Sequence, residues 1–363
     1  MAKYKIAWLP GDGIGKDVCE ATMLVLKAMK FDAEYIHGDI GWDFWVNEGD
    51  AFPERTINLM KNTDAAFFGA ITSKPKSEAE NELSSSLRGK GLSYRSPIVR
   101  MRQLFDLYIC LRPIKAYPGN PLNYKEGIDI VVFRENTEDL YSGVEFAKIP
   151  DEMFKIKGME KVPKDAAISL KVNTKKGCER IAKAAFDFAR KNKRKKVTVV
   201  HKANVVRVTD GLFLETAKEI SKNYPEIQFD NANIDALGMW LLKNPLNYDV
   251  LLAPNLYGDI ISDLCAQLVG GLGFGCSGNI GDNYAVFEPT HGSAPKYAGL
   301  YKVNPIASIL AAKMMLEWLG EKEGAQKVEN AVRAVIKEGI VRTYDMGGSN
   351  STLEMADAIA RKI

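Results

Sequence analysis

The sequence predicts an α/β protein built in two lobes. Apolar stretches of strand length alternate with helical patterns along the chain, as in sheets covered by helices. The 363 residues exceed the usual size of a single hydrophobic core, so two lobes are expected. The first strand ends in a glycine-rich turn, Pro10 to Gly15, from which a helix begins. This turn lacks the spacing of a Rossmann fingerprint, and a tight turn with positive φ explains its glycines at least as well.

The composition is that of an ordinary globular protein and gives no sign of nucleic-acid or membrane partners. The net charge of +3 is too small to indicate either. No apolar run reaches the length of about 18 residues that a membrane span needs, and no signal-peptide pattern is present. The five cysteines are scattered and lack C-x-x-C spacing. Reduced thiols and a cytoplasmic location are therefore expected.

The N-terminal third begins with strand patterns at 6–9 and 65–68 and helical patterns at 18–29 and 53–61. Residues 73–94 are polar with little periodicity, so a lid or mobile surface loop is expected there. Pro97 is well placed to start a helix. A strand at 107–111 should follow, with Arg112 at its end.

The rest of the chain continues the alternation. Strand patterns fall at 128–133, 197–200, 227–230 and 250–253, and helical patterns at 174–191, 212–222, 305–318, 324–337 and 353–361. Thr174 is a typical N-cap, and residues 144–170 have the mixed polarity of an extended arm. The basic run from Arg190 to Lys196 lies between a helix and a strand. A solvated helix end is favoured over a phosphate-binding patch.

Two carboxylates, Asp259 and Asp263, stand four residues apart where the strand at 250–253 gives way to a helical pattern. They should project from one helix face, where Mg²⁺ or Mn²⁺ would relieve their repulsion. A solvated face is the simpler alternative, but the apolar flanks and the position after a strand favour a site.

Three arginines and a lysine also end predicted elements. Arg102, Arg112 and Arg134 would form a polyacid pocket if they converge, and separate surface salt bridges are an equal alternative. Lys202 follows a strand and is a candidate base if its pKa is lowered, although a lysine there is commonly a surface charge.

Together these motifs resemble those of the β-decarboxylating dehydrogenases, the family of isocitrate, homoisocitrate, 3-isopropylmalate and tartrate dehydrogenases. The resemblance runs from about Lys5 to Ile363. It is carried, in family order, by Leu9-Pro-Gly-Asp-Gly-Ile-Gly15, Asp106-Leu-Tyr108, Leu111-Arg-Pro113, Phe133-Arg-Glu-Asn136, Lys202-Ala-Asn204, Asn255-Leu-Tyr-Gly-Asp259 with Asp263, and Glu288-Pro-Thr-His-Gly-Ser-Ala-Pro295.

The resemblance implies a two-domain α/β fold distinct from the Rossmann fold. Residues 1–105 and 255–363 would form a discontinuous large domain that binds the cofactor. Residues 106–254 would form a small central domain, with a dimerising arm at about 142–170. The expected assembly is a homodimer whose active sites lie between the domains and take residues from both subunits.

The resemblance also implies roles for single residues. Tyr141 would protonate the product and Lys202 would act as the base. Asp235, Asp259 and Asp263 would bind Mg²⁺ or Mn²⁺, with Lys202 and Asp235 coming from the partner subunit. The implied substrate-binding residues are Arg95, Ser96, Ile98, Arg102, Arg112, Arg134 and Asn204.

The cofactor loop is similar to that of NADP-dependent isocitrate dehydrogenases. NAD-dependent relatives commonly carry an Asp where this chain has Lys296, and a cation suits a 2′-phosphate. Tyr344 also matches those enzymes, although the arginine expected after it is absent. NADP is favoured, with NAD as the alternative. The implied cofactor-binding residues are Ile14, Thr72, Glu288, His291, Gly292, Ser293, Ala294, Lys296, Tyr297, Val303 and Asn304.

The substrate signals are mixed. Ser96 matches isocitrate enzymes, whereas Ile98 falls where isopropylmalate enzymes are apolar. Arg95 and Arg100 add positive charge, and a buried arginine without an anionic partner is costly, so a substrate with an extra carboxylate is expected. Isocitrate ranks first, then homoisocitrate, then 3-isopropylmalate or tartrate. A non-catalytic regulatory subunit is the rival from another class, but the residues of the chemistry are all present.

Overall fold

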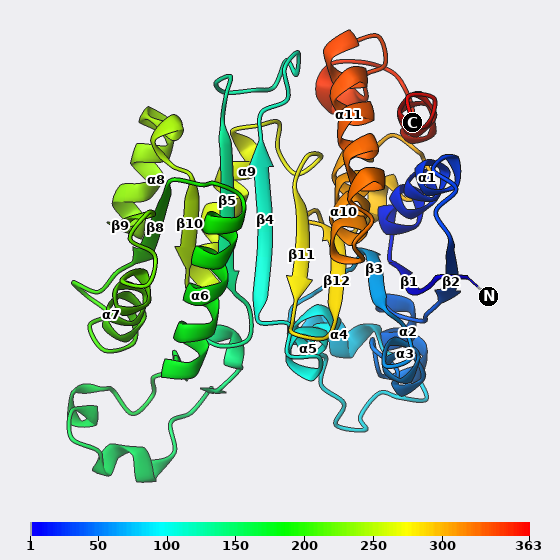
Figure 1. Ribbon diagram of the computed structural model, residues 1–363. Coiled ribbons are helices and arrows are strands. Elements are labelled where there is room, and N and C mark those ends of the chain that lie inside the picture. Colours follow the sequence, from blue (N-terminus) through cyan, green and yellow to red (C-terminus); the bar gives the residue numbers. More distant parts are fainter. Residues whose placement is uncertain (1) are drawn as a thin grey trace.

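The computed structural model describes residues 2–363, which fold around one ten-stranded mixed sheet (Figure 1). Across the sheet the strands are β2 (Ala33–His37), β1 (Tyr4–Gly11), β3 (Ala65–Ala70), β12 (Ala285–Pro289), β11 (Cys276–Ile280), β4 (Ile109–Lys115), β5 (Asp129–Glu135), β10 (Val250–Ala253), β8 (Lys196–His201) and β9 (Gln228–Asn233). Two parallel sets flank the centre, where β11 is antiparallel to β12 and β4, and β4 is antiparallel to β5.

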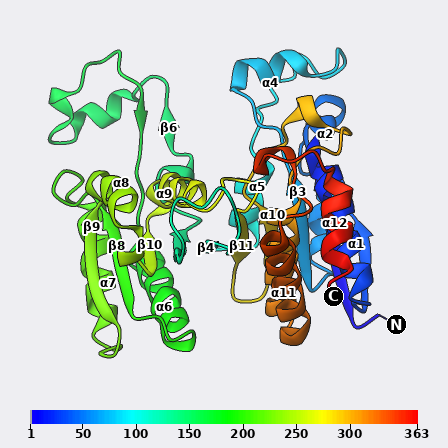
Figure 2. The same ribbon diagram turned by 90° about the horizontal axis from the view of Figure 1, so that it is seen from above.

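Helices cover both faces of the sheet (Figure 2). They are α1 (Ile14–Ala28), α2 (Trp42–Glu48), α3 (Glu54–Met60), α4 (Lys76–Glu82), α5 (Pro97–Leu104), α6 (Lys175–Lys191), α7 (Thr209–Ser221), α8 (Ile234–Lys243), α9 (Asn255–Gln267), α10 (Ile306–Trp318), α11 (Lys322–Glu338) and α12 (Thr352–Ala360). This is the α/β class that the sequence predicts.

Burial of both sheet faces follows from the two-residue period of a strand. In β5, Val131 and Phe133 pack with α6, whereas Ile130 and Val132 between them pack with α8 and α9. The other end of the sheet repeats the pattern: alternate residues of β1 and β3 face α1 with α10 to α12, or α3 with α5. The expected limits of the two domains, 1–105 with 255–363 and 106–254, stay a prediction.

Several expectations about the elements were wrong. Arg112 does not end a strand: β4 begins later than expected and continues through Pro113, because its whole length pairs with β5. The polar stretch 73–94 is not entirely loop, since it contains α4, whose Ala79 is fully buried. Helix α7 begins earlier, at Thr209.

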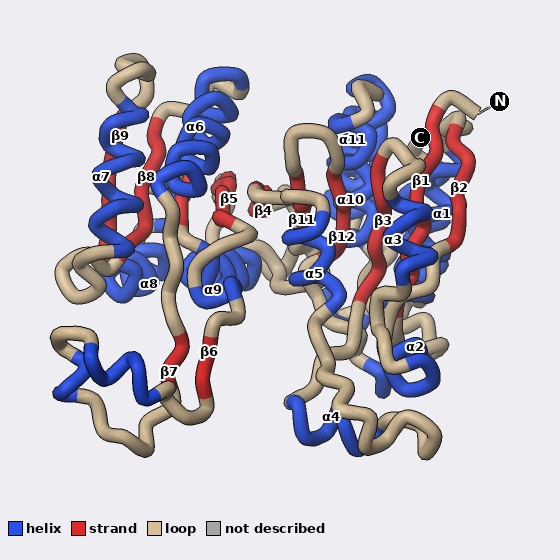
Figure 3. Tube along the Cα trace, turned by 90° about the horizontal axis from the view of Figure 1, so that it is seen from below, coloured by secondary structure: helices blue, strands red, loops and turns tan. Residues whose placement is uncertain are grey.

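The predicted arm is a distinct feature of the chain. Residues 142–170 leave the body of the protein and return through β6 (Glu145–Phe146) and β7 (Ile168–Ser169), which pair antiparallel; three short 3₁₀ turns, Leu140–Ser142, Asp151–Lys155 and Met159–Lys161, lie before and between these strands (Figure 3). After the arm, the Thr174 side chain accepts from the Gly177 N–H and starts α6 as predicted. No helix within residues 2–363 has the length and apolar character to span a membrane.

Candidate functional site

The acidic pair lies on α9, directly after the buried strand β10. Asp259 Oδ1 lies 3.5 Å from Arg112 Nη1, and Asp263 Oδ1 lies 3.1 Å from the same nitrogen. Both carboxylates therefore face one guanidinium, which confirms that they share one face of the helix. Ser262 also accepts from Arg112 Nη1, at 2.7 Å.

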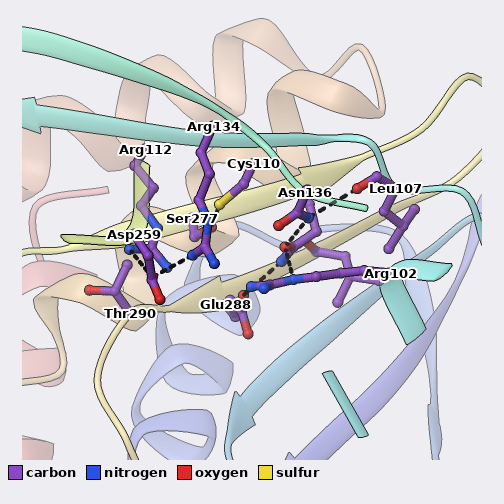
Figure 4. Close-up of polar contacts among 12 residues, drawn as sticks. Arg102, Leu107, Cys110, Arg112, Arg134, Asn136, Asp259, Ser277, Glu288 and Thr290 are labelled. Carbon is purple, nitrogen blue, oxygen red and sulfur yellow. Dashed lines mark hydrogen bonds and ion pairs between the residues drawn. The ribbon is translucent and has the colours of Figure 1, made fainter. Parts of the chain in front are cut away.

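Arg134 is held against the start of the same helix by Asn255 and Asp259, and Figure 4 shows its side chain beside Asp259. It is 1% exposed, and its Nε and Nη2 donate to Asn255 Oδ1 at 2.9 and 2.7 Å. Its Nη1 forms an ion pair with Asp259. The Tyr141 hydroxyl donates to the other oxygen of Asp259 at 2.6 Å, and its ring lies 5.0 Å from the Arg134 guanidinium carbon.

Arg102, in the last turn of α5, is fixed by a different set of partners. Its Nε donates to Asn279 Oδ1 at 2.9 Å, and its Nη2 lies 3.4 Å from Glu288 Oε1. Asn279 Oδ1 also accepts from Asn136, and Asn279 Nδ2 donates to Glu288 at 2.7 Å. Figure 4 shows Arg102, Arg112 and Arg134 in one region. The three arginines are therefore not separate surface salt bridges.

The charges in this region change one another's pKa. Burial raises the pKa of Asp259, but Arg134 and Arg112 outweigh it, so the pKa of this carboxyl is lowered. Burial raises the pKa of Asp263, and the negative charge of Asp259 adds to this effect. Burial and the positive charge of Arg102 lower the pKa of Arg134. Burial and the hydrogen bond to Asp259 raise the pKa of Tyr141, which keeps its phenol protonated at neutral pH.

Lys202 and Asp235 form a second cluster, with Nζ donating to Oδ1 at 2.6 Å. This bond lowers the pKa of Asp235. Asn204, in the same segment, is exposed. Between residues 2 and 363 no three His, Cys, Asp or Glu side chains gather as a metal site, so one chain does not bring Asp235 to Asp259 and Asp263. The prediction that Lys202 and Asp235 serve the partner's site stays a prediction.

The loop after β12, which is the predicted cofactor loop, packs on the glycine turn after β1. Gly13 has φ 53°, and a Cβ there would lie 2.1 Å from the Ser293 carbonyl oxygen, so only glycine allows this approach. The same oxygen accepts from the Ile14 N–H at 2.9 Å, and the Ser293 hydroxyl is 2.7 Å from that of Thr72. A tight turn with positive φ thus explains Gly11 and Gly13, whereas Gly15 lies in α1 and is required by the close approach of Ala70.

The other predicted cofactor residues lie around this contact. Ile14 and Val303 are buried in a small apolar cluster, against which Ala294 and Tyr297 pack. The Lys296 ammonium lies 5.0 Å from the Tyr297 ring centre, and Tyr297 stacks on Tyr344 at 6.0 Å. Asn304 is buried and donates to Asp345. His291 and Gly292 follow β12, and Glu288 contacts Arg102 instead of the loop.

The argument from buried, unpaired arginines was wrong. Arg95 is exposed, because it precedes α5 in a surface segment. Arg100 is half-buried and pairs with Asp50 at 2.7 Å, and it also donates to the Phe52 carbonyl. Neither arginine therefore carries a desolvation cost that a substrate must relieve.

Comparison with known proteins decides the family. The profile of the isocitrate/isopropylmalate dehydrogenase family matches residues 5–359. The chain belongs to this family. It is accordingly an NAD(P)-dependent decarboxylating dehydrogenase, as the resemblance implied.

Relatives in the family act on different substrates. The chain is 40% identical to 3-isopropylmalate dehydrogenase of Methanothermobacter thermautotrophicus, over 100% of this chain and 99% of the relative. It is 41% identical to homoisocitrate dehydrogenase of Methanocaldococcus jannaschii, over 99% and 97%. The crystal structure of isocitrate dehydrogenase from Methylococcus capsulatus superposes with a TM-score of 0.88 at 39% identity, covering 99% of both chains.

Sequence reasoning gave no role to Asn255, Ser262 or Asn279 in this dehydrogenase, although each binds one of the three arginines. Asn255 lies in a recognised motif and directly follows a strand, so its position gave a usable signal. Asn279 gave none, because the strand Cys276–Ile280 has little apolar character and was not predicted at all.

Proposed function

We propose that this dehydrogenase oxidises and decarboxylates isocitrate to 2-oxoglutarate with NADP, as a homodimer that uses Mg²⁺ or Mn²⁺. Homoisocitrate, 3-isopropylmalate and tartrate remain the alternative substrates, and NAD the alternative cofactor. The observation that carries the proposal is the gathering of Arg102, Arg112 and Arg134 around Asp259 and Tyr141. Guanidinium groups so placed suit a substrate with several carboxylates.

The chain's own residues divide the chemistry. The arginines would orient the carboxylates, and the partner's Lys202 would take the proton of the C2 hydroxyl as hydride leaves C2 for the nicotinamide. The resulting β-keto acid would then lose CO₂, and the enolate of the product would remain. Tyr141 would then donate its proton to that carbon, a role that its raised pKa supports because the phenol stays protonated.

A divalent cation fits the carboxylates of α9. Asp259 and Asp263 supply oxygen ligands to one space, and the negative charge of Asp259 helps raise the pKa of Asp263, a repulsion that a cation would relieve. Asp263 is 56% exposed, so one ligand already faces solvent. When bound, such a metal supplies Lewis-acid polarisation of the carbonyl next to the carboxylate that leaves.

A dinucleotide fits the loop after β12. A Cβ at Gly292 would meet nothing within 4 Å, so space is free beside the backbone there. Lys296 is exposed and has no ion pair within the described chain, which leaves its charge available to a 2′-phosphate. When bound, the cofactor would accept the hydride. The apolar cluster of Ile14, Val18 and Val303 would exclude water from one side of the cofactor.

The choice of isocitrate rests on Arg95 and Ser96 beside the substrate helix. Arg95 is exposed and lacks an ion pair among residues 2–363, so it is free to meet an additional carboxylate. Ile98 lies one turn before Arg102 on α5 and packs on the neighbouring core, which favours an apolar substrate group instead. Arg95 thus supports isocitrate and Ile98 supports a substrate with an apolar group. The measured activities decide between these substrates.

The deciding experiment is an initial-rate assay at 340 nm with Mg²⁺ and either NAD or NADP. Isocitrate, homoisocitrate, 3-isopropylmalate, tartrate and malate are compared at equal concentrations. We expect the highest kcat/KM for isocitrate with NADP, and no reduction after chelation of the metal. A higher kcat/KM for 3-isopropylmalate would refute the substrate assignment but leave the reaction class intact. If no substrate gave cofactor reduction, the proposed reaction would be refuted.

A further inference from the structure

A buried ion cluster lies near the arginine site but shares no residue with it. Lys171 Nζ forms an ion pair with Asp210 and lies 3.7 Å from Asp139 Oδ1. Both carboxylates are fully buried, and the lysine side chain is 15% exposed. Two buried carboxylates with one ammonium are costly unless further donors complete their hydrogen bonds.

The further donors are backbone amides from two separate parts of the chain. The Lys202 N–H donates to Asp210 Oδ2 at 2.7 Å, and the Leu256 N–H donates to Asp139 Oδ2 at 2.9 Å. Lys202 directly follows β8, whereas Leu256 lies in the first turn of α9. Lys171 thus joins the segment of the proposed base to the helix of the proposed metal ligands.

Other contacts fix the cluster in place. The Lys171 ammonium lies 4.5 Å from the ring centre of Tyr257 on α9. Burial and the charge of Asp210 raise the pKa of Tyr257 to about 12, so its phenol stays neutral beside that carboxylate. Asp139 has φ 69°, a conformation that a non-glycine residue keeps only when its surroundings impose it. Its N–H donates to the Val172 carbonyl at 2.7 Å, next to Lys171.

We propose that Lys171 is a positioning residue, which holds the backbone at Lys202 and the start of α9 in place through Asp210 and Asp139. The proposal rests on the proposed function, because it assigns support to the base and the metal ligands of that reaction. Lys171 contacts Asp210, Asp139 and Tyr257, but none of the reacting groups. Its effect on the reaction would be transmitted by the hydrogen bonds from the Lys202 and Leu256 N–H groups to the two carboxylates.

The first test is Lys171→Met, which keeps the length of the side chain and removes its charge. Hydrogen exchange should become faster by about tenfold or more in both segments, 202–206 and 255–259, as expected when a hydrogen bond to a charged group is weakened. The kcat should fall by about tenfold or more with a smaller change in KM, since small displacements of reacting groups are costly. Lys175→Met is the control, because Lys175 is 75% exposed and its ion pair with Glu179 lies on the surface.

A double variant separates positioning from general destabilisation. In Lys171→Met with Asp210→Asn, the amide oxygen still accepts from Lys202 N–H without an unpaired charge. Exchange at 202–206 should return toward the wild-type rate, with partial recovery of kcat, whereas 255–259 should stay fast because Asp139 remains unpaired. If the single variant does not fold, this difference between the two segments is measured on the double variant.

Wild-type exchange in both segments, or an unchanged kcat in folded Lys171→Met, would overturn the proposal. Equal recovery of both segments in the double variant would do so as well. These exchange measurements need no substrate. An inactive wild-type protein would therefore refute the proposed reaction, while the exchange data would still decide the role of Lys171.

Discussion

At the scale of single residues, Asn279 is the side chain that orients Arg102, one of the proposed substrate-binding arginines. It is fully buried and binds Arg102, Asn136 and Glu288 at once. An amide is suited to this position because it accepts from the guanidinium with its oxygen and donates to a carboxylate with its nitrogen. Without it, Arg102 would keep its 3.4 Å ion pair with Glu288 but would lose the acceptor that holds its Nε.

We therefore expect Asn279→Ala to raise KM for the substrate more than it lowers kcat. Loss of a hydrogen bond to a charged group is worth about 1.5–3 kcal/mol, which corresponds to a fall in kcat/KM of roughly 10- to 150-fold. Most of the change should lie in KM for the carboxylate substrate. Steady-state kinetics would show it, with Asn283→Ala, in the exposed turn after β11, as the control. An unchanged KM would mean that Arg102 is oriented by Glu288 alone.

Cofactor preference should depend on Lys296. A carboxylate at this position would repel a 2′-phosphate and accept hydrogen bonds from a free ribose, so Lys296→Asp should move the ratio of kcat/KM values toward NAD. We expect a shift of at least about tenfold, equivalent to 1.4 kcal/mol. Lys302→Asp changes an exposed lysine nearby and should leave the ratio unaltered. A ratio that moves equally in both variants would point to overall charge instead of a phosphate contact.

At the scale of elements, the glycine in the first turn of α9 controls how closely that helix approaches β5. A Cβ at Gly258 would lie 2.6 Å from Cγ and 2.7 Å from Cβ of Arg134. These atoms are the first two carbons of the buried Arg134 side chain, so they have little room to move. Asp259 is the next residue, and its ion pair with Arg134 relies on the same close contact.

Gly258→Ala should therefore destabilise the protein and the site together. Overpacking of this kind costs about 1–3 kcal/mol, although alanine is the better helix former by about 1 kcal/mol. Denaturant unfolding would measure the loss of stability, and kcat/KM should fall with it because Arg134 is displaced. Gly211→Ala, where a Cβ would meet nothing within 4 Å, provides the same substitution without the clash. A Gly258 variant as stable and active as the Gly211 variant would contradict this account.

The elements also show which features local sequence can predict. Helix α9 and its paired carboxylates followed from an apolar strand ending at Ala253 and a four-residue spacing. Strand β4 was misplaced because Pro113 and Lys115 do not resemble a strand, and pairing with β5 determines its end. Strand β11 was missed because its Asn279 is buried by tertiary hydrogen bonds and not by an apolar pattern. The arginine motifs thus indicated a site, while its supporting amides depended on contacts distant in sequence.

At the scale of the whole molecule, the antiparallel centre of the sheet joins the two parallel sets, and a buried carboxylate fastens it to α11. Glu329 accepts from Lys115 Nζ at 2.6 Å and from the Tyr117 hydroxyl at 3.1 Å. Lys115 ends β4, and Tyr117 lies in the connection that leads from β4 to β5. A cavity of about 300 Å³ lies here, lined by β4, α6, α10 and α11. Glu329 thus links the central strands to α11.

This link should make stability depend on pH in a defined direction. Burial raises the pKa of Glu329, but the hydrogen bond and charge of Lys115, the charge of Lys313 and the hydrogen bond from Tyr117 together outweigh burial, so the folded pKa lies below the ordinary value of 4.5. Its contribution is therefore complete above pH 4.5 and is lost as the pH falls through the lower folded pKa. Glu329→Gln should reduce the free energy of unfolding at pH 7 by about 1–3 kcal/mol, and the difference from wild type should shrink in acid. Denaturant titrations at pH 7 and at an acidic pH below the folded pKa of Glu329 would test this, with exposed Glu323→Gln as the control. A loss of the same size at both pH values would show that the substituted amide is packed badly and that the charge of Glu329 contributes nothing.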